Sequence, residues 1–293
     1  MTAAPTPLIL TLTGNLLAER TLDFETWEPG RTQRARAESF QVGGKGINVA
    51  RMLRRLGAPH TALCFAGGAT GAECEAWLQA RGFHHRVFRT TGATRAGTVV
   101  RAPDRPETTF LGPDVPPDAA AAAACAEYLD AQPAGTVLAV CGSLPGWATP
   151  ALAPLRDALA RWARRGLLAV DTYGPALADL AALRPDLVKI NAQEFAGLPE
   201  KVRSGGFNGP TRWIVTDGPA PVRVRDAAGE RTFLPPKVTE VSPTGSGDVL
   251  FACVLAELYQ RGGTLDTAVR RALPYAAANA AHPGIAEFPE PAA

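Results

Sequence analysis

Short apolar segments alternate with longer amphipathic segments along most of this chain. In the second half, the apolar runs predict strands at 137–141, 167–171 and 187–190, and the segments between them predict helices at 150–165 and 175–183. Strands that alternate with helices at this spacing form a parallel sheet with helices on both of its faces. The pattern therefore predicts a protein of the α/β class.

The first half of the chain shows the same alternation less regularly. It predicts strands at 8–13, 61–66 and 84–88 and helices at 46–56, 71–80 and 118–131. Near the C-terminus, strands are predicted at 213–216 and 222–225, and a helical region begins near Asp248. We find no internal repeat, and no low-complexity segment other than the alanine run at 119–124.

Two polar stretches interrupt the alternation. Residues 31–41 alternate loosely, as an exposed strand would, and residues 98–102 and 108–111 predict a hairpin around Pro103-Asp104-Arg105-Pro106. Because these strands do not fit the parallel sheet, they predict a small accessory sheet. Such a sheet is a candidate lid over an active site.

Composition excludes several classes of protein. The 293 residues are 46% hydrophobic, enough for a large core, and the formal net charge of +2 gives no reason to expect a nucleic acid or an anionic membrane as partner. The five cysteines lack C-x-x-C spacing, which predicts buried thiols in a reducing cytosol and no metal cage or disulfide framework. The N-terminus lacks a basic segment, and no apolar run approaches the ~18 residues that span a bilayer. We therefore expect a cytoplasmic protein without a signal peptide.

The most informative stretch is Thr244-Gly245-Ser246-Gly247-Asp248, which is followed by an apolar run at 249–258 that predicts a buried helix. Free N–H groups and the helix dipole make such a glycine-rich start a binding site for an anion. A carboxylate beside a bound phosphate can take a proton from an attacking hydroxyl group. The stretch therefore predicts phosphoryl transfer.

A second glycine cluster, Val42-Gly43-Gly44-Lys45-Gly46, precedes the helix predicted at 46–56. Alone it is weak evidence, because glycines before helices are mostly simple turns. It is not a Walker A loop, since no Ser or Thr follows the lysine, and Gly67-Gly68-Ala69-Thr70-Gly71 lacks the acidic partner of a dinucleotide fingerprint. Only four of the 30 basic residues are lysines, so the one among these glycines is notable.

Five motifs in order resemble those of the ribokinase-like (PfkB) carbohydrate kinases, in particular the 1-phosphofructokinase and tagatose-6-phosphate kinase branch. The resemblance extends over residues 8–284. It is carried by Gly43-Gly44-Lys45-Gly46-Ile47-Asn48, Thr94-Arg95, Cys141-Gly142-Ser143-Leu144-Pro145-Gly146, Lys189-Ile190-Asn191-Ala192-Gln193-Glu194 and Pro243-Thr244-Gly245-Ser246-Gly247-Asp248.

The resemblance implies a three-layer α/β/α sandwich with a mainly parallel central sheet and a small β-sheet lid. It implies one kinase domain over residues 1–293, with lid strands from about 20–41 and 94–112. In this family the lid often serves dimerisation, so a homodimer through the lid is an open expectation. Exposed strand edges are consistent with such pairing.

The resemblance also implies ATP and Mg²⁺ as cofactors and assigns the catalytic groups. Asp248 would be the general base, and the N–H groups of Gly245, Ser246 and Gly247 would form the anion hole for the transferring phosphoryl group. The nucleotide side would comprise Lys189, Asn191, Glu194, Thr216, Gly218, Gly245 and Gly247, with Asn191 and Glu194 acting on Mg²⁺ through water. Pro221 replaces a later glycine of the family at this edge.

On the sugar side, the resemblance implies that Lys45, Arg95 and Ser143 hold a phosphate already on the substrate. The sugar hydroxyls would meet Glu19, Gly43, Gly44, Asn48 and Asp248. Two positions depart from the family. Glu19 stands where the branch has an aspartate, and Gly97 stands where it has an asparagine.

We therefore expect an ATP-dependent kinase of a phosphorylated ketohexose, with fructose 1-phosphate or tagatose 6-phosphate as acceptor. Fructose 6-phosphate or another sugar is an alternative within the family. A non-catalytic sugar-phosphate sensor on the same fold is the alternative from another class, because a fold does not fix a function.

Overall fold

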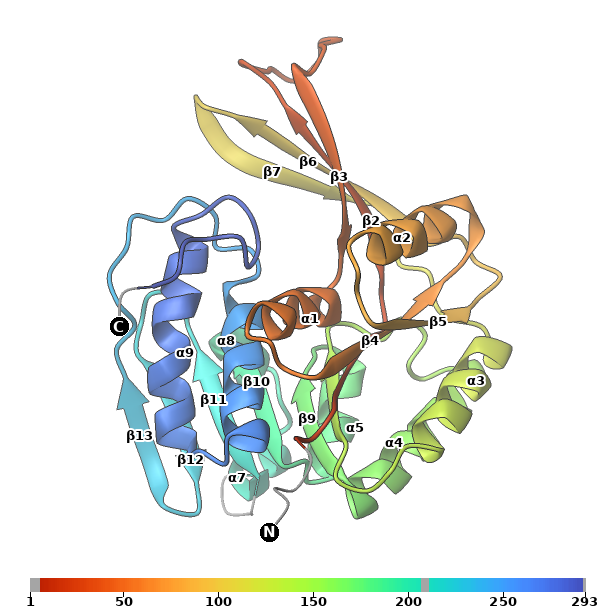
Figure 1. Ribbon diagram of the computed structural model, residues 1–293, viewed down its shortest axis with the longest axis vertical. Helices are drawn as coiled ribbons and strands as arrows, with labels where there is room; N and C mark the ends of the chain where they lie inside the picture. The colour runs from red at the N-terminus through yellow and green to blue at the C-terminus, as the bar shows by residue number, and fades with distance from the viewer. Residues whose placement is uncertain (1–5, 207–210, 292–293) are drawn as a thin grey trace.

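The computed structural model describes residues 6–206 and 211–291 and contains two sheets of different size (Figure 1). The strands of the larger sheet are β1 (Ile9–Thr13), β4 (His60–Ala66), β5 (His85–Arg89), β8 (Val137–Cys141), β9 (Leu167–Asp171), β10 (Leu187–Asn191), β11 (Arg212–Thr216), β12 (Val222–Asp226) and β13 (Gly229–Phe233). Their order is β13-β12-β11-β10-β9-β8-β1-β4-β5. All neighbours from β5 to β11 are parallel, and β12 and β13 add an antiparallel edge.

Helices cover both faces of this sheet. One face carries α1 (Lys45–Arg55), α8 (Ser246–Leu255), η2 (Ala256–Gln260) and α9 (Leu265–Ala280). The other carries α3 (Ala119–Asp130), η1 (Pro150–Leu152), α4 (Ala153–Arg165), α5 (Pro175–Ala182), α6 (Ala192–Ala196) and α7 (Glu200–Gly206). Successive strand residues point to opposite faces, so Ile9 packs under α1 and α8 while Leu10 and Leu12 pack under α3 and α4.

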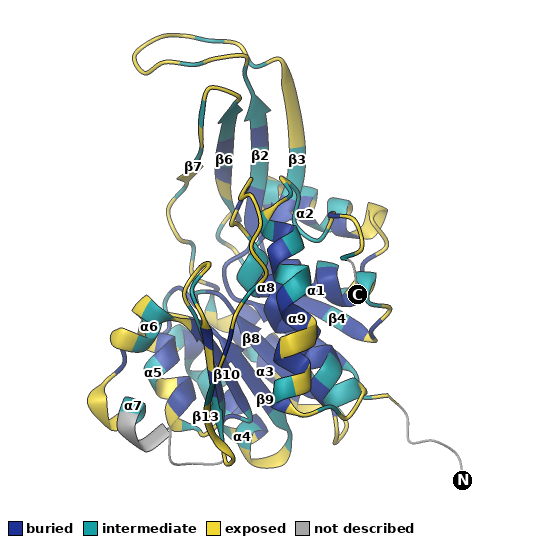
Figure 2. Ribbon diagram, turned by 90° about the vertical axis from the view of Figure 1, so that its left-hand side faces the viewer, coloured by how far each residue is buried: buried dark blue, intermediate teal, exposed yellow. Residues whose placement is uncertain are grey.

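The smaller sheet projects from the sandwich beyond α1 and α2 (Gly68–Ala80) (Figure 1). It consists of β2 (Leu17–Asp23), β3 (Ala37–Gly43), β6 (Arg95–Ala102) and β7 (Arg105–Leu111), in the order β3-β2-β6-β7. Its central pair, β2 and β6, is parallel, and both outer pairs are antiparallel. The two outer strands are the more exposed ones (Figure 2).

The α/β class, the mainly parallel sheet and the small second sheet are confirmed. The strand expected at 31–41 is wrong in its first half, because β3 begins only at Ala37 and ends at Gly43. The pattern missed β2 because Leu17 and Ala18 are both buried, which removes the alternation that marks a half-buried strand. It also missed β13, α6 and α7, and the helix expected at 150–165 starts as a 3₁₀ turn.

The structure also bears on two expectations from composition. The five cysteines are free thiols in buried positions, as predicted. No helix within the described residues has both the length and the apolar character that a bilayer-crossing helix needs.

Candidate active site

A cavity of about 450 Å³ lies where the carboxyl ends of the parallel strands face the small sheet. In α/β proteins, ligands bind at this edge of the sheet. Predicted site residues from six separate segments meet there. Those lining the cavity are Glu19, Gly43, Gly44, Lys45, Asn48, Arg95, Lys189, Asn191, Thr216, Gly245, Gly247 and Asp248.

The remaining predicted residues, Ser143, Glu194, Gly218 and Ser246, do not line the cavity directly. Ser143, Glu194 and Ser246 are linked to it through hydrogen bonds or an ion pair with residues that do line it or flank it. Gly218 lies in the turn after β11, has a positive φ of 53° and is followed by a bond from the Ala220 N–H to the Asp217 carbonyl. It therefore belongs to a tight turn beyond the cavity wall.

The glycine turn before α8 requires its glycines. Gly245 has φ 79°, in the left-handed region that L side chains rarely adopt, and a Cβ there would stand 2.7 Å from the Ile285 side chain. A Cβ on Gly247 would stand 2.6 Å from Lys189 Nζ. The first turn of α8 thus presents bare backbone N–H groups next to an ammonium group, which is an arrangement suited to a phosphoryl group.

Asn279 holds this turn in place from α9. Its amide nitrogen donates to the Thr244 carbonyl at 2.9 Å and to Ser246 Oγ at 3.1 Å, and its side-chain oxygen accepts from the Ala286 N–H at 2.9 Å. The side chain is 1% exposed. Sequence reasoning did not identify Asn279, because it lies 35 residues from Thr244 in an alanine-rich helix.

Asp248 lies in the first turn of α8 and is buried. Its Oδ2 accepts a hydrogen bond of 2.7 Å from the Asn48 side chain on α1. Burial raises the pKa of Asp248 to about 6, and the nearby negative charge of Asp171 adds to the effect, while Lys45 and Lys189 oppose it. A carboxylate with this pKa can accept a proton near neutral pH.

Asp171, at the end of β9, is the fully buried centre of the site. One of its oxygens accepts from Lys45 Nζ at 2.8 Å, and the other accepts from Lys189 Nζ at 2.7 Å. Burial alone would raise the pKa of Asp171, but the charges of Lys189 and Lys45 outweigh it, so the carboxylate stays ionised. The sequence placed Asp171 only at a strand end and gave no sign of its two partners.

Asn191 and Glu194 form a reciprocal cap at the start of α6. The Asn191 N–H donates to Glu194 Oε2, and the Glu194 N–H donates to Asn191 Oδ1, both at 2.8 Å. Glu194 Oε1 lies 3.8 Å from Lys45 Nζ. The amide and carboxylate oxygens of this pair are of the donor types that Mg²⁺ accepts.

Arg95 and Ser143 belong to one polar network beside the cavity. Arg95 Nη1 pairs with Asp114 at 3.0 Å, and Asn15 Nδ2 donates both to Asp114 Oδ1 at 2.8 Å and to Ser143 Oγ at 2.9 Å. Arg95 Nε is buried without a partner among the described residues. Sequence reasoning did not identify Asp114, which follows the hairpin strand β7.

Glu19 and Gly97, the two positions that depart from the family pattern, are paired residues on β2 and β6. Glu19 accepts a hydrogen bond from the Gln41 side chain on β3. A Cβ at position 97 would stand 3.0 Å from Leu17 Cδ1 and 3.1 Å from Leu111 Cδ2. The two altered positions therefore reshape the same patch of the small sheet.

The chain is similar to known proteins along most of its length. The family described as pfkB family carbohydrate kinase matches residues 13–293. The 1-phosphofructokinase of Rhodobacter capsulatus is 30% identical over 262 residues, which cover 83% of this chain and 81% of that protein. The ATP-dependent 6-phosphofructokinase isozyme 2 of Mycobacterium tuberculosis is 30% identical over 298 residues, which cover 96% of this chain and 86% of that protein. The structure of phosphofructokinase-2 from Escherichia coli with fructose-6-phosphate superposes with a TM-score of 0.83, 23% identity and 94% coverage of each chain.

We predict that Asp171→Ala strongly destabilises the protein, because it leaves the ammonium groups of Lys45 and Lys189 without their counter-ion. Removing one partner of a buried ion pair costs about 3–5 kcal/mol, measurable as the free energy of unfolding in urea. The matched control is Asp130→Ala, which breaks a half-exposed pair with Arg161 and should therefore cost much less. Equal losses for the two variants would contradict the central role of Asp171.

Proposed function

The chain belongs to the pfkB family of carbohydrate kinases, and we propose that it transfers the γ-phosphoryl group of ATP to a hydroxyl of a phosphorylated ketohexose. Membership makes it a sugar-phosphate kinase. The observation that carries the proposal is the meeting of three groups in one cavity. The carboxylate of Asp248, whose pKa burial raises to about 6, lies at a bare glycine turn, Gly245 to Gly247, and shares the cavity with the Arg95 guanidinium.

In the proposed reaction, Asp248 takes the proton of the acceptor hydroxyl group while the oxygen of that hydroxyl group bonds to the γ-phosphorus of ATP. The bond from that phosphorus to the oxygen bridging it to ADP breaks, and ADP leaves. The N–H groups of Gly245, Ser246 and Gly247 stabilise the charge on the transferring group. Lys189, held by Asp171, adds positive charge at the same place.

Mg²⁺, when bound through water to Asn191 and Glu194, would neutralise charge on the ATP phosphates. These two residues, with Lys189, Thr216, Gly218 and the glycine turn, form the proposed nucleotide side. Thr216 lines the cavity at the end of β11, next to Asn191 at the end of β10. Thr216 and Asn191 are paired residues on neighbouring strands, which supports a continuous binding edge for the nucleotide.

Arg95, Ser143 and Lys45 form the proposed clamp for the phosphate that the acceptor already carries. A guanidinium group suits phosphate as a fork and an ammonium group as a point charge. Glu19, Gly43, Gly44 and Asn48 would then face the sugar hydroxyls. We favour fructose 1-phosphate, in line with the name of the Rhodobacter capsulatus relative, or tagatose 6-phosphate.

Fructose 6-phosphate is the second candidate acceptor, since the Mycobacterium tuberculosis relative is named a 6-phosphofructokinase. Because Glu19 and Gly97 depart from the family pattern, another sugar is a further alternative acceptor. A non-catalytic sensor is the remaining alternative. The buried, raised-pKa carboxylate of Asp248 opposes it, because a sensor has no need of a proton acceptor.

The substrate is tested by ADP release in a coupled assay with fructose 1-phosphate, fructose 6-phosphate, tagatose 6-phosphate and free hexoses. We expect turnover with one of the 1- or 6-phosphorylated ketohexoses and only weak turnover with free hexoses.

Asp248→Asn keeps the shape of the side chain but removes the proton acceptor, so kcat should fall by roughly 10²–10⁴-fold or more. Turnover of the wild type with none of the sugars would favour the sensor. A fully active Asp248→Asn variant would contradict the assignment of Asp248 as the general base.

We predict that kcat/KM falls as the pH drops through about 6, because Asp248 must be deprotonated to act as a base and burial raises its pKa to about 6. The second ionisation of the substrate phosphate has a similar pKa of about 6, so this acidic limb of the pH profile does not by itself identify the titrating group. Asp171→Asn distinguishes the two. It removes a neighbouring negative charge and so lowers the pKa of Asp248, which should move the limb to lower pH. A limb that stays in place would assign it to the substrate.

We further propose that the small sheet mediates a homodimer. Its outer strand β7 presents Phe110 and Leu111, whose exposed fractions are 56% and 55%. Light scattering should give twice the mass of one chain, and Phe110→Glu with Leu111→Lys should reduce it to that of one chain. Wild-type protein with the mass of a single chain at micromolar concentration would contradict this proposal.

A further inference from the structure

A second, open pocket of about 270 Å³ adjoins the catalytic cavity, and Ile285 lines both. It is lined by the C-terminal half of α1, the end of α2 and the segment 285–287. Four arginines line it, and the proposed function uses none of them. These are Arg51, Arg54, Arg55 and Arg81, and we call them the arginine cluster.

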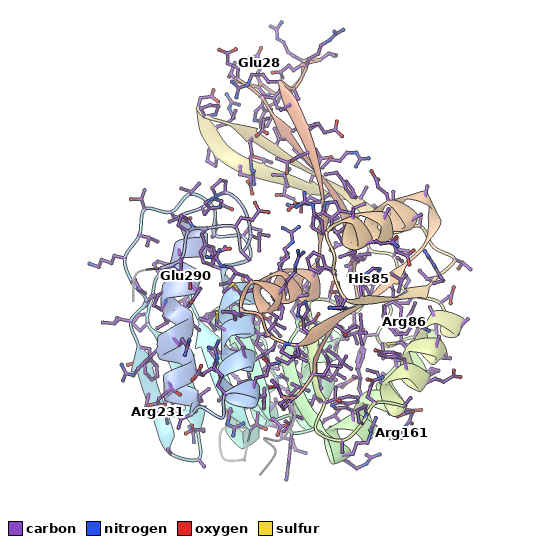
Figure 3. The ribbon with its side chains drawn as sticks, viewed as in Figure 1. Glu28, His85, Arg86, Arg161, Arg231 and Glu290 are labelled. Carbon is purple, nitrogen blue, oxygen red and sulfur yellow. The ribbon has the colours of Figure 1, made fainter. Side chains whose placement is uncertain are left out.

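The positive charge of the arginine cluster is only partly balanced. Arg55 pairs with Glu290 at 2.9 Å, and Arg51 lies 3.9 Å from Glu287. For Arg54 and Arg81, no carboxylate lies within ion-pair distance in the ranges 6–206 and 211–291. Figure 3 shows Glu290 beside α9, at this side of the molecule. The cavity therefore carries a surplus of positive charge.

The protein holds these guanidinium groups in place. Arg51 and Arg81 lie over the ring of Trp77, at 4.9 and 5.0 Å from its centroid, and Arg54 lies 5.2 Å over Phe83. The Arg51 side chain is only 8% exposed, and its Nε has no partner within the described residues. Burial lowers the pKa of Arg51, and the charge of Arg81 adds to this. A bound anion would reduce the electrostatic repulsion between these arginines.

Two contacts connect the arginine cluster to the catalytic cavity. Arg51 Nη2 donates to Gln41 Oε1 at 3.0 Å, and the Gln41 amide donates in turn to Glu19. On the other side, Ile285 lines both cavities and packs against Gly245 of the anion hole. An occupant that moved Arg51 or Ile285 would therefore act on the sugar patch or on the glycine turn.

We propose that the arginine cluster binds a small phosphorylated metabolite with at least two negative charges, and that its occupancy is transmitted to the catalytic cavity. Guanidinium groups match phosphate oxygens in pairs, and several of them favour a polyanion over a single phosphate. The volume suits a diphosphate or a bisphosphate of a small sugar. Because guanidinium groups already cover Trp77, recognition proceeds through charge and not through stacking of a nucleobase.

The test is isothermal titration of the full chain with inorganic pyrophosphate, without Mg²⁺ and at low salt. We expect two classes of site, one in the catalytic cavity and one at the arginine cluster. Arg54→Gln with Arg81→Gln should weaken the second class at least tenfold, while kcat without pyrophosphate stays within about twofold of wild type. The matched control is Arg161→Gln with Arg164→Gln, two exposed arginines of α4. Figure 3 shows Arg161 at the opposite edge of the molecule from Glu290.

Transmission from the arginine cluster to the catalytic cavity is tested by measuring the hydrogen exchange of the backbone amides in the segment 283–288. Pyrophosphate should slow its exchange in the wild type and in the α4 control, but not in the variant of the arginine cluster. A single class of site in the wild type would overturn the binding proposal, as would unchanged two-site binding in the cluster variant. Binding at the cluster with unchanged exchange of 283–288 would overturn the transmission. Neither the titration nor the hydrogen exchange depends on which sugar the enzyme phosphorylates.

Discussion

The buried carboxylate of Asp171 is the interaction on which the rest of the site depends. An isolated ionised group is costly to bury, and two ammonium groups in one small cavity repel each other. Asp171 resolves both problems at once, since each of its oxygens receives one lysine. The two lysines come from α1 and β10, so the ion triad also fixes these elements to the end of β9. Its charge then helps to hold the pKa of Asp248 near neutrality.

Helix α1 extends this constraint across the molecule. Its first residue, Lys45, enters the ion triad, and Asn48 one turn later donates to Asp248. Arg51 follows almost two turns on and reaches Gln41 of the small sheet. Residues three apart are neighbours on the helix surface, so Asn48 adjoins both Lys45 and Arg51. A single helix therefore connects the proposed catalytic base, the small sheet and the arginine cluster, which gives the proposed transmission a structural path.

The sequence was informative wherever chemistry was encoded locally. The glycine turn at Gly245 and the cap formed by Asn191 and Glu194 are contiguous motifs, and the α/β order followed from the alternation of apolar runs. What the sequence did not reveal were partners that only folding brings together. Asp171 lies 126 residues from Lys45, and Asn279 reaches the glycine turn from another helix. Strand β2 escaped detection for a related reason, since its order comes from pairing with β3 and β6 and not from its own pattern.

The register of the small sheet gives the two family departures a common explanation. Taken along the sequence, a longer carboxylate at 19 and a lost amide at 97 are separate changes. In the fold they are partners on β2 and β6, and the bare backbone of Gly97 is packed between Leu17 and Leu111. A side chain at 97 would crowd these leucines, whereas Glu19 reaches further than an aspartate and is tethered by Gln41. The same Gln41 is held by Arg51. A change of sugar preference and a change of response at the arginine cluster would thus pass through the same side chain.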